Sequence, residues 1–151
     1  MAKSSLKIND SKWRQVKARF PEIAGVSVDV GIQSDAGTGE KGVPIVAYGA
    51  ANEFGRGNVP ERSFIRSTFD EQRSAWGKLA DKLIGGILDL KLAPNKVFSV
   101  LGAKAEDDIK QKITALRTPP NSPITIERKG SSNPLFDNGD LRRAIRYVVK
   151  K

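Results

Sequence analysis

The 151-residue sequence contains no histidine and no cysteine. Without histidine, the chain lacks the most common general base and the most common metal ligand of proteins. A Ser-His-Asp or Cys-His catalytic site therefore cannot form within it. Without cysteine, it has no disulfide framework, no thiol nucleophile and no thiolate metal site. We therefore expect a protein that is not an enzyme and that holds no metal or cofactor.

Long apolar runs are also missing. No window approaches the roughly 18 apolar residues of a membrane-spanning helix, and residues 1–11 lack the apolar core of a signal peptide. The composition, 38% hydrophobic and 28% charged, is typical of a globular domain made in the cytoplasm with no membrane partner. At this length we expect one domain over residues 26–151, preceded by a basic helix or extension over residues 1–25.

Positive charge is present in excess, and it is concentrated at the two ends of the chain. The net charge is +9; residues 1–20 carry six basic side chains and one acid, and residues 142–151 carry five basic side chains and no acid. Basic ends commonly meet nucleic acid or acidic protein surfaces, although they can also serve only solubility. The candidates for contact with a partner or DNA are Lys12, Arg14, Lys17, Arg19, Arg142, Arg143, Arg146, Lys150 and Lys151.

The spacing of apolar residues predicts an α+β fold. Apolar residues recur at helical spacing over residues 68–92 and 95–116, which predicts two long helices. Strict alternation predicts a strand over residues 26–32, and the run Tyr147-Val148-Val149 predicts one over 146–150. A third strand is expected at about 124–128. We therefore expect a small, mainly antiparallel sheet packed against the two long helices. Residues 34–42 are expected to form an extended arm or loop.

Local signals predict where some elements begin and end. A first helix is expected to begin at residue 10 or 11 and to end before Pro21. Thr68 and Glu71 have the spacing of a capping box, which predicts Thr68 as the N-cap of the first long helix. The Asn-Gly pair ending at Gly139 is expected to form a turn with a positive φ angle.

Two patterns suggest chemistry that we do not expect here. The glycine-rich segment 34–42 lacks the Gly-Lys-[Ser/Thr] sequence of a phosphate-binding loop, so it is interpreted as a flexible hairpin or arm. The acidic run Glu106-Asp107-Asp108 could bind Mg²⁺ in a nuclease that uses Asp107 or Asp108. Adjacent residues on a helix point to different sides, however, which favours a structural acidic patch.

Several motifs occur in a fixed order along the chain. Asn52-Glu53-Phe54-Gly55 is followed by Val59-Pro60-Glu61-Arg62-Ser63-Phe64-Ile65-Arg66; after the two long helices come a Pro-Pro-Asn-Ser-Pro segment and Pro134-Leu135-Phe136-Asp137-Asn138-Gly139-Asp140-Leu141. Over residues 43–149 this order resembles the tail-completion and virion-morphogenesis proteins of tailed bacteriophages and prophages, which include minor tail proteins like lambda's protein Z. Asn138 stands where that family usually has Thr, and it keeps the chemistry of the turn.

The resemblance assigns a structural role to Asn52, Glu53, Phe54, Gly55, Pro60, Phe64, Pro134, Leu135, Asp137, Gly139 and Leu141. It implies a virion protein of the phage neck or tail that acts in tail completion or head–tail joining. Such proteins form rings around the DNA channel, here expected to be a hexamer or dodecamer. The implied partners are neighbouring connector and tail tube or terminator proteins, and packaged double-stranded DNA. The alternatives are a tail terminator that caps the tail tube and, from the terminal charge, a sequence-independent nucleic-acid-binding protein.

Overall fold

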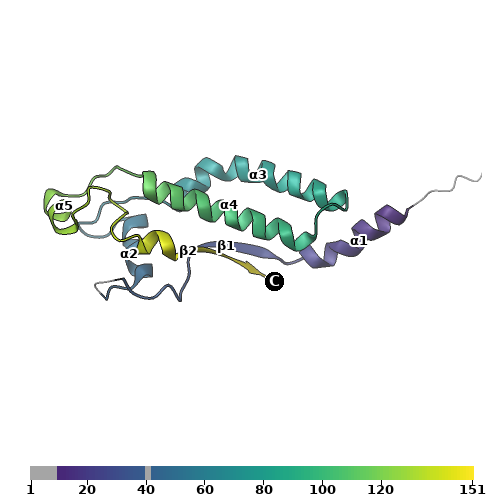
Figure 1. Ribbon diagram of the computed structural model, residues 1–151, viewed down its shortest axis with the longest axis horizontal. Coiled ribbons are helices and arrows are strands. Elements are labelled where there is room, and N and C mark those ends of the chain that lie inside the picture. The colour runs from purple at the N-terminus through teal and green to yellow at the C-terminus, as the bar shows by residue number, and fades with distance from the viewer. Residues whose placement is uncertain (1–9, 40–41) are drawn as a thin grey trace, which may run out of the picture.

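The computed structural model describes residues 10–39 and 42–151, which form helices and a two-stranded antiparallel sheet (Figure 1). The elements are α1 (Ser11–Ile23), β1 (Ser27–Ile32), α2 (Ile45–Phe54), α3 (Arg66–Leu88), α4 (Pro94–Ala115), α5 (Pro123–Lys129), α6 (Asp140–Ala144) and β2 (Ile145–Lys150). The predicted α+β class, a small antiparallel sheet with two long helices, is confirmed. The first nine residues of the predicted N-terminal extension lie outside the described residues.

Helix α4 occupies the middle of the molecule, with α3 on one side and the β1–β2 sheet on the other (Figure 1). It contacts both because apolar residues line more than one of its faces, including the buried Val97, Ala105 and Ile109. Gly102 lets the sheet come very close: a Cβ atom there would lie 2.4 Å from the Tyr147 ring. The sheet is therefore held against α4 by direct contact between a ring and a helix backbone.

The hydrophobic core lies towards the C-terminal end of α4. Its largest fully buried side chains are Phe64, Ile109, Ile113, Leu135 and Ile145. They come from the loop before α3, from α4, from the loop before α6 and from β2. The core thus joins segments that are far apart in the sequence.

The two strands pair in one antiparallel register, with Val30 opposite Tyr147. The backbone N–H of Tyr147 donates to the Glu106 carboxylate on α4, with 2.9 Å between nitrogen and oxygen. A charged side chain that occupies a strand edge in this way blocks further pairing there. Among the described residues, no comparable bond is made to the outer edge of β1.

The strand predicted at 124–128 is wrong, because these residues form helix α5. Ser122 caps this helix, since its side chain accepts from the backbone N–H of Thr125, and Pro123 takes the first helical position. Gly130 ends the helix with a φ angle of 67°. These local start and stop signals select a helix for this segment, so the sheet has two strands rather than three.

Two predicted helix boundaries are also wrong. Pro21 does not end α1 but lies inside it, and it leaves unpaired only the carbonyl of Lys17, an exposed residue. Helix α3 begins before Thr68, whose hydroxyl donates to the carbonyl of Phe64 one turn earlier rather than capping the helix. The turn at Gly139 is confirmed, with a φ angle of 85°.

Candidate partner-binding cavity

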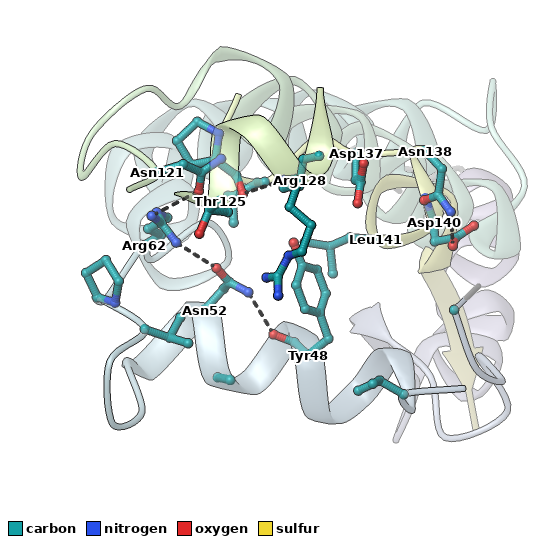
Figure 2. Close-up of a pocket in the computed structure, with 18 of the residues that line it drawn as sticks. Tyr48, Asn52, Arg62, Asn121, Thr125, Arg128, Asp137, Asn138, Asp140 and Leu141 are labelled. Atoms are coloured by element: carbon teal, nitrogen blue, oxygen red, sulfur yellow. Dashed lines mark hydrogen bonds between the residues drawn. The ribbon is translucent and has the colours of Figure 1, made fainter. Parts of the chain in front are cut away.

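A cavity of about 740 Å³ lies between α2 and the segment 120–141, at the end of the molecule that carries α5 (Figures 1 and 2). We call it the α2–α5 cavity. Its apolar walls include Ile45, Ala51, Val59, Pro134 and Leu141. A concave volume of this size, with apolar walls and a few polar groups, is typical of sites that hold a ligand or a partner's side chain.

The guanidinium of Arg62 holds the floor of this cavity together, and the residue is only 6% exposed. Its Nε donates to the carbonyl of Pro119 at 2.8 Å, and its Nη2 to the carbonyl of Pro120 at 2.9 Å. Weaker bonds reach the side-chain oxygens of Asn52 and Asn121, at 3.2 and 3.3 Å. All four acceptors are neutral, so within the described residues the charge of Arg62 has no carboxylate partner. Burial lowers its pKa, but a guanidinium stays charged in proteins.

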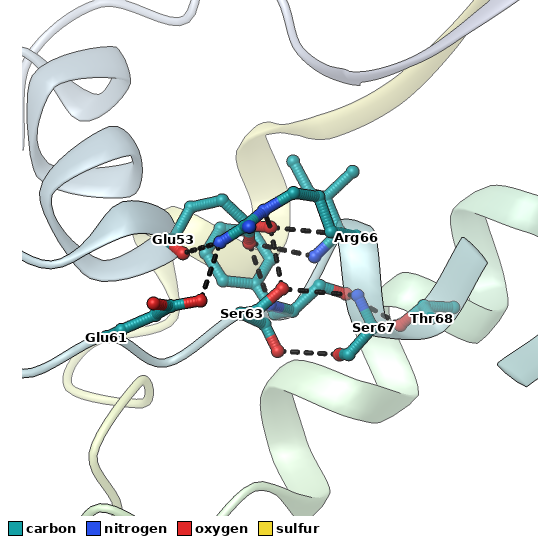
Figure 3. Close-up of polar contacts among 8 residues, drawn as sticks. Glu53, Glu61, Ser63, Arg66, Ser67 and Thr68 are labelled. Atoms are coloured by element: carbon teal, nitrogen blue, oxygen red, sulfur yellow. Dashed lines mark hydrogen bonds and ion pairs between the residues drawn. The ribbon is translucent and has the colours of Figure 1, made fainter. Parts of the chain in front are cut away.

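Beside this network, the carboxylate of Glu53 caps the start of α3 (Figure 3). It accepts from the backbone N–H groups of Phe64, Ile65 and Arg66, at 2.7, 2.9 and 3.0 Å. The hydroxyl of Ser63 and the Nε of Arg66 add bonds of 2.8 and 3.1 Å. The first N–H groups of a helix lack partners inside the helix and favour negative charge, which explains why a buried carboxylate is stable here.

Two opposing effects set the pKa of Glu53. Burial has the largest effect and raises the pKa, but the hydrogen bonds from Ile65, Arg66, Phe64 and Ser63 together outweigh it. The pKa therefore lies below its ordinary value, and the carboxylate is ionised at neutral pH. The end of α2 is in this way fastened to the start of α3 by a charged cap.

Three polar side chains face the interior of the cavity (Figure 2). Arg128 reaches from α5 into its centre and has no ion pair or hydrogen bond within residues 10–39 and 42–151. Tyr48 points in from α2, and Asp137 from the opposite wall. Burial, followed by the charge of Asp137, raises the pKa of Tyr48 despite an opposing effect of Arg62. The Tyr48 hydroxyl therefore stays protonated and can donate a hydrogen bond.

The residues that carry the family resemblance gather around this cavity and the core beneath it. Asn52 and Glu53 are buried in the two polar networks, and Phe64, Leu135 and Leu141 belong to the core. Gly55 and Gly139 have the positive φ angles of 72° and 85°, and Pro60, Pro134 and Asp137 line the cavity. Phe54 is exposed, with the guanidinium of Arg66 4.7 Å from its ring centre. Motifs separated by more than 60 residues in the sequence thus form one unit.

The basic residues proposed as contacts for a partner or DNA do not line the α2–α5 cavity, and most of them bond to other residues of the chain. Arg14, Lys12, Arg143, Arg146 and Lys150 form ion pairs with Asp10, Asp89, Asp140, Asp35 and Asp29 respectively. Arg19 donates to the carbonyl of Leu92. Lys17, Arg142 and Lys151 have no such partner in the described part of the chain. The candidates do not form one patch, since α1 projects from the end opposite the cavity whereas Arg142 and Arg143 lie on α6 (Figure 1).

The acidic run on α4 makes three separate contacts. Glu106 binds Tyr147 and Lys110, Asp107 accepts from Gln111, and Asp108 is buried against Lys104 and Trp76. Over the described ranges, no group of three acidic, histidine or cysteine side chains is arranged to hold a metal ion. No helix in these ranges has the length and apolar character needed to cross a membrane.

No protein-family model, curated protein or solved structure matches this chain. The α2–α5 cavity itself was not foreseen from the sequence, and neither were the roles of Tyr48, Arg62 and Arg128. The one local signal was an arginine inside the Val59–Arg66 motif, between a proline and an apolar anchor, where burial of its side chain could have been suspected. The meeting of Tyr48 and Arg128 depends on how α2 and α5 approach each other, which residue spacing does not encode.

Proposed function

We propose that this protein is a structural subunit of a tailed-phage particle that acts at the head–tail junction, in tail completion or head–tail joining, as part of a ring around the DNA channel. The observation that carries the proposal is the mutual contact of the residues on which the resemblance depends. Asn52 and Glu53 are polar and buried, and each meets partners from the Val59–Arg66 motif. Arg62 in turn binds the Pro-Pro-Asn segment beginning at Pro119.

These contacts matter because a chance similarity of short motifs gives no reason for the motifs to touch. Burying polar side chains is costly unless every group finds a partner. Here no buried side-chain nitrogen or oxygen in the described ranges lacks a hydrogen-bond partner. The order of the motifs therefore has a physical explanation as one interlocked structural unit, which supports treating the resemblance as a family relationship.

The two ends of the molecule differ in chemistry, which suits assembly into a ring. The α2–α5 cavity lies at one end and the projecting, largely exposed α1 at the other (Figure 1). Trp13, on α1, is 57% exposed. Contacts between unlike surfaces of identical subunits generate closed rings when the rotation between neighbours closes. The proposed partners remain the connector and tail tube or terminator proteins of the neck, with packaged DNA inside the channel.

Deletion of the gene from its phage or prophage tests the proposal. The expected lysate contains DNA-filled heads and finished tails that are not joined, as seen by electron microscopy, and a plasmid copy of the gene restores joined particles. Overlong tails would instead identify a tail terminator. Mass spectrometry of purified particles should find the protein at a fixed copy number, and its complete absence from them would exclude both virion functions.

A second candidate, sequence-independent nucleic-acid binding, is favoured by Lys17, Arg142 and Lys151, which have no partner among residues 10–39 and 42–151, and by the weakness of exposed ion pairs. Binding dominated by phosphate contacts weakens steeply with salt. The test is whether the protein binds duplex DNA tightly at low salt and releases it by about 0.2 M salt. If it does so and never enters purified particles, nucleic-acid binding replaces the virion proposal.

A further inference from the structure

We propose that the α2–α5 cavity binds a peptide segment of a partner protein in which a carboxylate side chain stands beside a large apolar side chain, with the carboxylate paired to Arg128. The inference concerns the cavity alone. It therefore stands or falls independently of the virion function.

Helix α5 forms the outer wall of the cavity, and it is held in place although none of its side chains is buried. Ile124 on it is 76% exposed. The wall is nevertheless fixed at its base, because Arg62 binds Pro119, Pro120 and Asn121 just before α5. A helix that is anchored at its base and has no fully buried residue leaves room for a second molecule between itself and α2.

The charges inside the cavity favour an anionic group. Arg128 points into the centre without a partner, and Arg62 beneath it has only neutral acceptors within the described residues. On the acidic side, Asp140 is already paired with Arg143, which leaves Asp137 as the lining carboxylate without an ion pair there. Two guanidinium groups thus face one uncompensated carboxylate. An arginine fork is suited to bind a carboxylate through two parallel hydrogen bonds.

The apolar walls of the cavity indicate that its ligand has an apolar part as well as a negative charge. Val43 and Val59, which are 50% and 36% exposed, present apolar surface that a free inorganic anion would leave unused, and the buried Ile45 and Leu141 lie behind it. An apolar ligand alone would bury Arg128 without a partner, which is unfavourable. An extended peptide satisfies both the apolar walls and the charge of Arg128. Its apolar side chain packs against the walls, its carboxylate pairs with Arg128, and its backbone N–H groups can donate to Asp137.

The exposed α1 of a second copy does not match the interior of this cavity, so a contact between the two ends of neighbouring subunits would use the surface around the cavity and leave its interior for another partner. Trp13 and Phe20 are the large exposed side chains of α1. They stand among the basic residues Lys12, Arg14 and Lys17, which would face Arg128 with like charge. A partner with acidic and apolar residues side by side is therefore the better fit.

Titration of the isotope-labelled full chain with short blocked peptides tests the proposal by NMR. The peptide acetyl-Gly-Phe-Glu-Gly-amide is expected to shift the resonances of Tyr48, Arg128 and Leu141. Its Gln counterpart should bind at least about 10-fold more weakly, since a hydrogen bond to a charged group contributes roughly 1.5–3 kcal/mol. The Lys counterpart should not bind.

Variants of the protein provide the matched controls. Arg128→Gln should weaken binding of the Glu peptide to the same degree, and Arg128→Glu should reverse the preference so that the Lys peptide binds. Arg73→Gln removes an exposed arginine of α3 that does not line the cavity, and should change nothing. Because Arg128 has no partner in the described chain, its variants should melt at the wild-type temperature. Ala51→Trp, which fills the cavity, should abolish binding.

Three results would overturn the proposal. The first is equal binding of the Glu, Gln and Lys peptides, and the second is no shift in the cavity at millimolar peptide. The third is concentration-dependent shifts of the cavity resonances without peptide, together with dimers in sedimentation that Arg128→Glu disrupts. That third result would show that the occupant is a second copy of this chain.

Discussion

The Glu53 cap gives the most quantitative prediction, through the substitution Glu53→Gln. Glutamine keeps the size of the side chain but replaces one acceptor oxygen with a donor. The Oε2 atom of Glu53 accepts from the backbone N–H groups of Phe64 and Ile65, and Oε1 accepts from the N–H of Arg66 and from its Nε. In either orientation of the new amide, at least two N–H donors therefore lose their acceptor.

The loss of stability expected for Glu53→Gln follows from the burial of the Glu53 side chain. The side chain of Glu53 is only 5% exposed, so water has little access to the backbone N–H groups that it caps, although the half-exposed Arg66 guanidinium can bond to water instead. Leaving a buried donor unsatisfied costs roughly 1–3 kcal/mol, which predicts a loss of about 2–5 kcal/mol in the free energy of unfolding. For a chain of this size the melting temperature should fall by roughly 4–20 °C, because 1 kcal/mol corresponds to about 2–4 °C.

Urea unfolding followed by circular dichroism at pH 7 measures this loss. The matched control is Glu61→Gln, because Glu61 also pairs with Arg66 but its side chain is 57% exposed. Exposed ion pairs contribute about 0–1 kcal/mol, so the control should lose little. A loss below about 1 kcal/mol for Glu53→Gln would refute the assignment of the cap, since a single unsatisfied buried donor already costs that much.

The same variant predicts a dependence on pH. The pKa of folded Glu53 lies below the ordinary 4.5, so its stabilisation is fully present above the unfolded pKa and is lost as pH falls through the folded pKa. The stability gap between wild type and Glu53→Gln should therefore stay constant from about pH 7 to 5 and narrow below about pH 4. A gap that widens on acidification would contradict this sign.

Three glycine substitutions give further predictions, each measured by urea unfolding. Gly102→Ala places a Cβ atom 2.4 Å from the rigid Tyr147 ring and should cost about 1–3 kcal/mol. Gly77→Ala, also inside a long helix but with nothing within 4 Å of the new Cβ, should instead stabilise by up to about 1 kcal/mol; equal effects of the two would show that the contact with Tyr147 is absent. Gly139→Val should cost more than about 1 kcal/mol because φ is 85° there, and an unchanged melting temperature would mean that the turn has another conformation.

Elements whose ends carry strong local signals were predictable from the sequence. Pro94 begins α4 and the stripe of apolar residues runs to its end, so this helix was predicted to within one residue at each end. The alternation of β1 and the positive φ of Gly139 were equally readable. The failure at 124–128 has a specific cause: the Ser122 cap and the Gly130 stop determine a helix here, and the prediction of a strand did not take these two signals into account.

The candidate site was predictable only in part. Asn52 and Glu53 were marked as structural through the resemblance, but not as the buried ends of two hydrogen-bond networks. Those networks require α2 to meet the start of α3 and the connector after α4, which is decided by the packing of the core. Arg128 is harder still to recognise, because on the sequence it is one basic residue among many. Only its position on α5, with its side chain pointing into the α2–α5 cavity, distinguishes Arg128 from the other basic residues.

The bond between Glu106 and Tyr147 has a consequence for aggregation. A two-stranded sheet with both edges open is a template on which strands can be added without limit, as in amyloid growth. Because the Glu106 carboxylate occupies the N–H of Tyr147 at the β2 edge, adding a strand there would break this bond, so strand addition is favoured at β1 and pairing of two copies through β1 would stop at a dimer instead of propagating into a fibre. This contact of Glu106 thus disfavours continued strand addition, in a protein whose proposed task requires many copies to gather in one place.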